Sequence, residues 1–212
     1  MNTGRWYHAV ATLGGSLLYA SGGFDSDLNT LASVEMLDVG AGTGTTWAAV
    51  APMLGPRARH AAASIGNLLY IFGGCSDYGC TAGHVLASVE VFYPGAQAWI
   101  ALDASAMPAP RSDFGVAVLG SSILLLGGST GFPFEGNLDT WKFEQIGSPH
   151  PYSGAWSNAT SFPTRHESEG IGPGGYGPMA ATASDDAGVE TSFYLAWDHA
   201  GWKCVGAGEC FG

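Results

Sequence analysis

The 212-residue chain has few charged side chains, and few of those are basic. Lys and Arg together number 7 against 18 Asp and Glu, so the formal net charge at pH 7 is −11. Because this charge repels phosphate backbones and anionic lipid head groups, nucleic acid and membrane surfaces are not expected partners. We favour solubility as the explanation of this acidity, which therefore excludes partners and selects none.

Long apolar runs are missing as well. Apolar stretches extend over about five to eight residues, far short of the roughly 20 that a membrane-spanning helix needs. The uncharged segment 6–24 has the composition of a secretory signal peptide, but its pattern recurs twice in the interior of the chain and includes glycine pairs. We therefore interpret this segment as a hairpin.

Cysteine is scarce and occurs as two local pairs, Cys75 with Cys80 and Cys204 with Cys210. Neither spacing is the CxxC of zinc and redox sites. Structural disulfides in an exported protein, free thiols in an intracellular protein and a metal site are the alternatives. Free thiols are preferred and the compartment stays open, with the cytoplasm favoured.

The chain also lacks the HExxH zinc motif, a Walker loop, the GxSxG elbow and a Cys-His signature. His8 and His60 occupy equivalent positions of an internal repeat in which the third copy has Phe114, so we expect both to be packing residues. The other histidines lack the i, i+4 spacing of metal ligands. No catalytic residue, metal or cofactor is predicted.

An internal repeat is what the chain does have. Segment 57–74, RARHAAASIGNLLYIFGG, is matched by RSDFGVAVLGSSILLLGG at 111–128 and by RWYHAVATLGGSLLYASGG at 5–23. A period of about 50 residues is typical of propeller blades. Further matches keep the same order and spacing: Ser33-Val34-Glu35 with Ser88-Val89-Glu90, Trp47 with Trp99, and Met53 with Met107.

Each copy predicts four antiparallel strands. Two short β-type runs form a hairpin that ends at Gly-Gly, an alternating third run follows, and a Trp opens the fourth strand. The copies cover approximately 5–50, 57–103 and 111–157, and 163–212 is either a degenerate fourth blade or an irregular segment. The sequence thus predicts an all-β chain with residues 1–212 as a single repeat region.

These residues resemble the kelch-repeat β-propeller family, whose repeat reads Arg, an apolar strand, Leu-Tyr-x-x-Gly-Gly, a loop, a Val-x-x-Tyr-Asp-like strand and a Trp. The resemblance covers roughly residues 5–165 and implies a kelch-type propeller or partial propeller of four-stranded blades. The third copy departs from it with Leu124-Leu125 where Tyr stands, and the fourth departs almost wholly. Since a propeller closes a ring of four to eight blades, we expect a fragment of a longer propeller, a four-bladed ring or an assembly of two chains.

Two residue types of the repeat have expected structural roles. Glycine adopts backbone angles that are closed to other residues, so each pair ends the second strand in a tight bend. Large aromatic rings fill the wedge between neighbouring sheets. The glycines are Gly22, Gly23, Gly73, Gly74, Gly127 and Gly128, and the rings are Tyr19, Tyr70, Trp47 and Trp99.

Strand alternation places the loop after each Gly-Gly and the loop before each Arg at one end of the sheets. Kelch proteins commonly bind protein partners, so the resemblance implies a non-enzymatic binding scaffold that uses these loops. For Arg57 and Arg111 the alternative is a structural role in tying blades together by hydrogen bonds. The candidate binding residues are Asp25, Asp27, Arg57, Arg59, Asp77, Tyr78, Arg111, Phe134 and Glu135. Self-association or further blades would complete the ring.

An enzyme is the alternative from another class. Copper-radical oxidases related to galactose oxidase contain a kelch-like propeller, and Gly4-Arg5-Trp6-Tyr7 with the strand after it is similar to their repeats. Such a site needs a Cys crosslinked to a Tyr, a second Tyr and two His ligands. Cys75, Tyr78 and His84 are suitable residue types in one loop, but no motif places a His pair. A carbohydrate-active enzyme on the same propeller belongs to this alternative.

Overall fold

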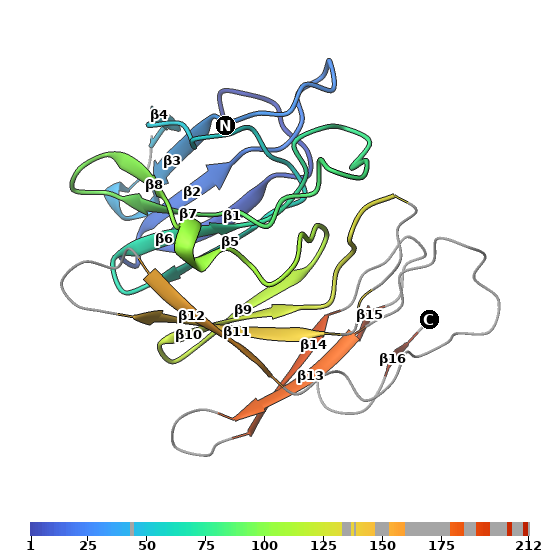
Figure 1. The fold of residues 1–212 in the computed structure, drawn as a ribbon. Coiled ribbons are helices and arrows are strands. Elements are labelled where there is room, and N and C mark those ends of the chain that lie inside the picture. The colour runs from blue at the N-terminus through green and yellow to red at the C-terminus, as the bar shows by residue number, and fades with distance from the viewer. Residues whose placement is uncertain are drawn as a thin grey trace.

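The computed structural model describes residues 1–42, 45–132, 137, 139–146 and 153–159, together with the backbone of strand segments 179–184, 190–195, 203–204 and 210–211. The predicted all-β class and the three four-stranded antiparallel blades are confirmed. In each blade the strands follow one another in chain order across the sheet, as consecutive hairpins produce (Figure 1). No described helix is long or apolar enough to cross a bilayer.

The strand bounds follow the repeat. Blade 1 consists of β1 (Ala9–Leu13), β2 (Leu17–Ser21), β3 (Val34–Asp38) and β4 (Ala48–Val50), with a 3-10 turn η1 (Val39–Ala41) after β3. Blade 2 consists of β5 (Ala61–Ile65), β6 (Leu68–Phe72), β7 (Val89–Tyr93) and β8 (Ala98–Ala101), followed by η2 (Asp103–Ser105). Blade 3 consists of β9 (Gly115–Leu119), β10 (Ser122–Leu126), β11 (Thr140–Ile146) and β12 (Ser153–Asn158).

Only strand pairs are described after blade 3. Strand β13 (Met179–Ser184) pairs with β14 (Glu190–Leu195), and β15 (Lys203–Cys204) pairs with β16 (Cys210–Phe211). The two paired cysteines of β15 and β16 were predicted as a local pair, but their side chains lie outside the described residues. Whether 163–212 is a degenerate blade stays a prediction.

The first strands of the three blades lie next to one another, β1 beside β5 and β5 beside β9 (Figure 1). A direct hydrogen bond joins two of them, from the Ser64 hydroxyl in β5 to the Thr12 carbonyl in β1 at 2.7 Å. The residues just before these strands are therefore brought together from different blades.

Apolar side chains fill the two spaces between the blades. Tyr19 of blade 1 contacts Phe92 of blade 2 with ring centroids 5.7 Å apart, and Trp99 stacks behind Phe92 at 4.9 Å. Between blades 2 and 3, Tyr70 contacts Phe143 at 5.5 Å. Tyr19, Tyr70 and Trp99 were expected to fill the wedges, whereas Phe92 and Phe143 were not singled out. The fourth expected ring, Trp47, is half-buried and lies outside both of these clusters.

Candidate functional site

The recurring arginine links one blade to the next. The Arg57 guanidinium is buried, with Nη1 donating to the Gly73 carbonyl at 3.1 Å and Nη2 forming an ion pair with Glu90 of the same blade. Its own carbonyl accepts from the Gly23 N–H of blade 1 at 2.9 Å. Arg57 thus binds its own blade through the side chain and the preceding blade through the backbone, and the Arg111 carbonyl accepts from the Gly74 N–H of blade 2 in the same way.

Blade 3 keeps this arrangement with a different partner. Arg111 donates to the Gly127 carbonyl at 2.7 Å, but the position of Glu90 is held by Trp141, and the guanidinium lies 3.7 Å from the centre of that indole ring. A cation–π contact therefore takes the place of the buried ion pair. The Arg111 guanidinium retains one ion pair, at 3.8 Å from the largely exposed Asp139 carboxylate. Since Arg57 and Arg111 are buried, their predicted partner-facing role is corrected: the structural alternative describes their contacts.

The residue two positions after each arginine forms a second row, which we call the inner row: Tyr7, Arg59 and Asp113. Their φ angles are +53°, +56° and +54°, in the left-handed region that side-chain-bearing residues rarely adopt. The Arg59 N–H donates to the Tyr7 carbonyl at 2.9 Å, and the Asp113 N–H donates to the Arg59 carbonyl at 3.0 Å. Strained residues of this kind cluster at functional sites.

Side chains of the inner row also contact one another. The Arg59 guanidinium lies 4.0 Å from the centre of the Tyr7 ring, and its Nη1 is 3.1 Å from Oδ1 of Asp113. Burial raises the pKa of the Asp113 carboxyl, while Arg59 and a hydrogen bond from Ser112 act in the opposite direction. Arg59, a predicted binding residue, therefore balances a buried carboxylate.

Three rings beside the inner row form what we call the aromatic patch: Trp6, Phe24 and Tyr78. Phe24 is fully buried, and its centroid lies 5.5 Å from Trp6 and 5.4 Å from Tyr78. The two outer rings are 5.8 Å apart, with Trp6 39% and Tyr78 48% exposed. The patch thus presents two aromatic side chains to solvent on an apolar support.

Two aspartates predicted for binding organise the loops that flank the patch. The Asp25 carboxylate accepts from the backbone and side-chain N–H groups of Asn29, and this hydrogen bonding lowers the Asp25 pKa. The Asp77 carboxylate accepts from the N–H and hydroxyl of Thr81 in the same i, i+4 pattern. Asp27 is exposed. All three aspartates lie in the loops that flank the patch.

A disulfide between Cys75 and Cys80 closes the loop that carries Tyr78, which corrects the preference for free thiols at this pair. Both cysteines are fully buried, and the Cys80 carbonyl accepts from the Phe132 N–H of blade 3 at 3.1 Å. The Tyr78 loop is therefore held by its own crosslink and by the next blade. A sulfur bonded in this way is unavailable for the Cys–Tyr crosslink of a copper-radical site, and among the described residues no three His, Cys, Asp or Glu side chains cluster as metal ligands would.

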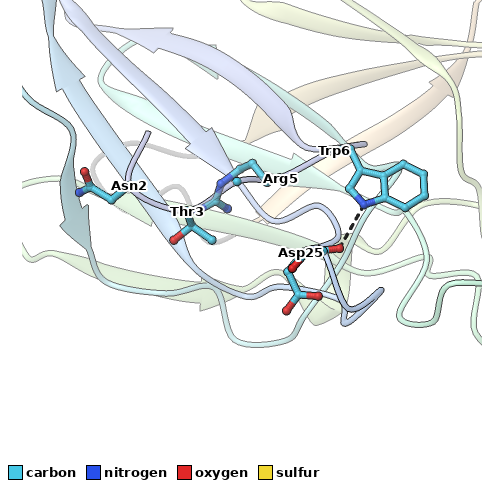
Figure 2. Close-up of a pocket in the computed structure, with 7 residues that line it drawn as sticks. Asn2, Thr3, Arg5, Trp6 and Asp25 are labelled. Atoms are coloured by element: carbon cyan, nitrogen blue, oxygen red, sulfur yellow. Dashed lines mark hydrogen bonds between the residues drawn. The ribbon is translucent and has the colours of Figure 1, made fainter.

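A shallow depression of about 530 Å³ lies on the other side of Trp6. Figure 2 shows the Trp6 indole N–H donating to the Asp25 carbonyl at 3.2 Å, which orients the ring at the edge of this depression. Its lining is formed by Asn2, Thr3, Gly4, Arg5, Trp6, Asp25 and Ser26. Trp6 thus belongs both to the aromatic patch and to the lining of this depression.

The predicted binding loops contain Asp25, Asp27, Asp77 and Tyr78, and the structure brings four further residues to them that the sequence analysis did not single out. Phe134 and Glu135 were predicted for this surface and lie outside the described residues. The sequence did contain a signal for the four further residues. They occupy repeat positions at which the three copies align but carry different side chains. The missed residues are Trp6, Tyr7, Phe24 and Asp113.

His60, expected to be a packing residue, lies buried between blades 1 and 2. Its Nε2 is 2.9 Å from the Ser21 hydroxyl, and its Nδ1 has no hydrogen-bond partner among the residues that the structure describes. Burial holds the pKa of His60 well below its ordinary value of 6.5, and the positive charge of Arg57 lowers it further. The native state therefore keeps this imidazole neutral at pH values where the unfolded chain protonates it.

We expect the free energy of unfolding to fall as the pH drops below about 6.5, by up to about 1.4 kcal/mol per pH unit for one proton bound only by the unfolded chain. His60→Phe, which copies Phe114 of blade 3, should reduce this slope in denaturant titrations between pH 7 and 5. Burial also lowers the His8 pKa, so part of the slope should remain. The exposed His84→Gln is the control, and an equal slope for His60→Phe and wild type would contradict the assignment.

Comparisons with known proteins agree with the repeat. A family model described as the KLHDC2/KLHL20/DRC7 Kelch-repeats domain matches residues 1–160. Kelch-like protein 35 of Mus musculus is 32% identical over 71% of this chain and 25% of its own length, and Kelch-like protein 26 of Danio rerio is 33% identical over 58% of this chain and 19% of its own length. Beta-scruin of Limulus polyphemus is 29% identical over 61% of the chain and 14% of its own length. The chain thus spans a quarter or less of these relatives.

Among solved structures, the one titled "Structure of YjhT" superposes with a TM-score of 0.60 at 18% identity. The match covers 92% of this chain and 64% of that chain, and at this low identity it concerns the fold alone. The family model covers well over half of the sequence, including all three blades. The chain belongs to the kelch-repeat family.

Proposed function

We propose that this chain is a protein-binding scaffold whose partner contacts the aromatic patch at the loop end of blades 1 and 2. The observation that carries the proposal is the pair of exposed rings, Trp6 and Tyr78, seated on the buried Phe24. Exposed apolar groups rimmed by polar side chains are a feature of interaction sites, and Trp and Tyr are enriched among the residues that dominate binding energy.

The rigidity of the support adds to this proposal. The Tyr78 loop is closed by a disulfide and bonded to blade 3, and the Trp6 ring is oriented by the Asp25 carbonyl. A surface that is ordered before binding loses little conformational entropy on association. Kelch propellers typically serve in protein interaction, which supports the same function.

Tyr78→Ala is expected to reduce recovery of partner proteins at least tenfold, because it removes one of the two exposed rings. The measurement is quantitative mass spectrometry of proteins that co-purify with the tagged chain from cells that express it. Val39→Ala is a matched control: Val39 is 57% exposed and lies at the other end of blade 1, where its N–H donates to the Ser16 carbonyl. The same proteins recovered by wild type and Tyr78→Ala, or a loss shared by Val39→Ala, would contradict the proposal.

A further inference from the structure

We infer that the segment of the partner that docks on the aromatic patch is cationic, presenting an Arg or Lys side chain to the rings of Trp6 and Tyr78. This inference rests on the proposed function of the same surface and specifies the chemistry of the partner. Its basis is the charge that surrounds the patch and the way in which the chain itself binds guanidinium groups.

The charge beside the patch is negative and unbalanced. Asp25 follows Phe24 directly, Asp77 precedes Tyr78, and Asp27 lies in the same loop as Asp25. Their recorded donors are neutral backbone, amide and hydroxyl groups, and none of the three takes part in an ion pair recorded for the described residues. The positive charge of Arg59 is already matched by Asp113.

The chain itself contains two cation–π contacts between an arginine guanidinium and an aromatic ring. Arg59 lies over Tyr7 with a carboxylate at its other side, and Arg111 lies over Trp141. Trp and Tyr rings attract cations through their quadrupole, and a nearby carboxylate adds a Coulomb attraction. Trp6 and Tyr78 are exposed rings in loops that carry aspartates, and no cation–π contact to either ring is recorded among the described residues, so a partner can supply the cation.

Alternative partner chemistries fit this surface less well. An acidic segment would be repelled by the three aspartates and by the overall charge of −11. A purely apolar segment would use the rings but would leave the carboxylates without a counter-charge. A basic segment is the class that engages both, and its association should be faster at low salt because the field steers it to this end of the molecule.

The test selects phage-displayed random 12-residue peptides on the immobilised full chain and sorts the clones by loss of binding to Tyr78→Ala. Clones that depend on Tyr78 should contain Arg and Lys at least twice as often as the unselected library. Synthetic versions of these peptides should bind the triple variant Asp25→Asn, Asp27→Asn, Asp77→Asn at least tenfold more weakly at 50 mM salt, with a flatter salt dependence. Asparagine keeps one oxygen to accept the backbone N–H groups of each loop, so the variant removes the charge and retains these backbone bonds. The second oxygen, which accepts from the Asn29 amide and the Thr81 hydroxyl, becomes an NH2 group, so an unchanged melting temperature of the variant is part of the test.

Asp38→Asn is the matched control, because Asp38 accepts the Gly40 N–H in a similar local turn at the far end of blade 1. Tyr78-dependent clones without basic enrichment, or with unchanged affinity for the triple variant, would overturn the cationic partner and leave the proposed binding surface standing. A selection that yields no Tyr78-dependent clones would overturn the inference and count against the proposed function itself.

Discussion

Replacing Gly73 with alanine is expected to lower the free energy of unfolding by about 3 kcal/mol. Gly73 has a φ of +54°, where an L-residue costs roughly 1–2 kcal/mol. A Cβ there would also collide with the Arg111 carbonyl and lie 2.6 Å from the Met107 methyl group. That carbonyl accepts the Gly74 N–H at 2.8 Å, so it cannot move aside without breaking the link between blades 2 and 3.

Alanine substitutions at two other glycines separate the backbone strain from the collision of the added Cβ. Gly66 has a φ of +59° with nothing within 4 Å of an added Cβ, so Gly66→Ala should show backbone strain without the collision. Gly95 has neither feature, and Gly95→Ala should change stability by less than about 0.5 kcal/mol. Urea titration of the three variants measures these differences. Equal losses for Gly73→Ala and Gly66→Ala would show that the close approach of the blades at Gly73 is not as described.

Arg57→Met is expected to destabilise the chain by about 3–5 kcal/mol, since it strands the buried Glu90 carboxylate without its counter-ion. The Gly73 carbonyl loses its donor in the same change. Arg111→Met should cost less, because its neighbour Trp141 carries no charge and the Asp139 side chain is 57% exposed. Thermal and denaturant unfolding of both variants measures the difference.

A third variant separates the stranded charge from the loss of packing. Arg57→Met combined with Glu90→Met removes both charges, so the double variant should be more stable than Arg57→Met alone. If the double variant were as unstable as the sum of the two single variants, the pair would not be coupled as its geometry requires.

Much of the fold could be predicted from the sequence because the repeat is carried by residues with local or blade-internal roles. The Gly-Gly pairs end the second strands, and alternating apolar residues form the sheets within each copy. The structural role of Arg57 could also be predicted, since Arg57 and Glu90 recur in blade 1 as Arg5 and Glu35. A carboxylate that recurs with an arginine is a signal for a structural ion pair.

The site was harder to predict because its residues come from different blades. Trp6 precedes the first strand of blade 1, whereas Tyr78 lies in a loop of blade 2, and only the packing of the two sheets brings these rings to 5.8 Å. The inner row joins three blades in the same way through Arg59. Comparison of the three copies shows which positions differ. Which of these positions contact one another depends on the arrangement of the blades.

The most direct test of this account is to place a photo-crosslinking amino acid at position 78 and, as a control, at position 39. Both native side chains are exposed, and they belong to opposite ends of the sheets. After irradiation in cells that express the chain, position 78 should give a discrete adduct with a partner protein that disappears in a Trp6→Ala background, and position 39 should not. Adducts at position 39 with none at position 78 would contradict binding at the aromatic patch.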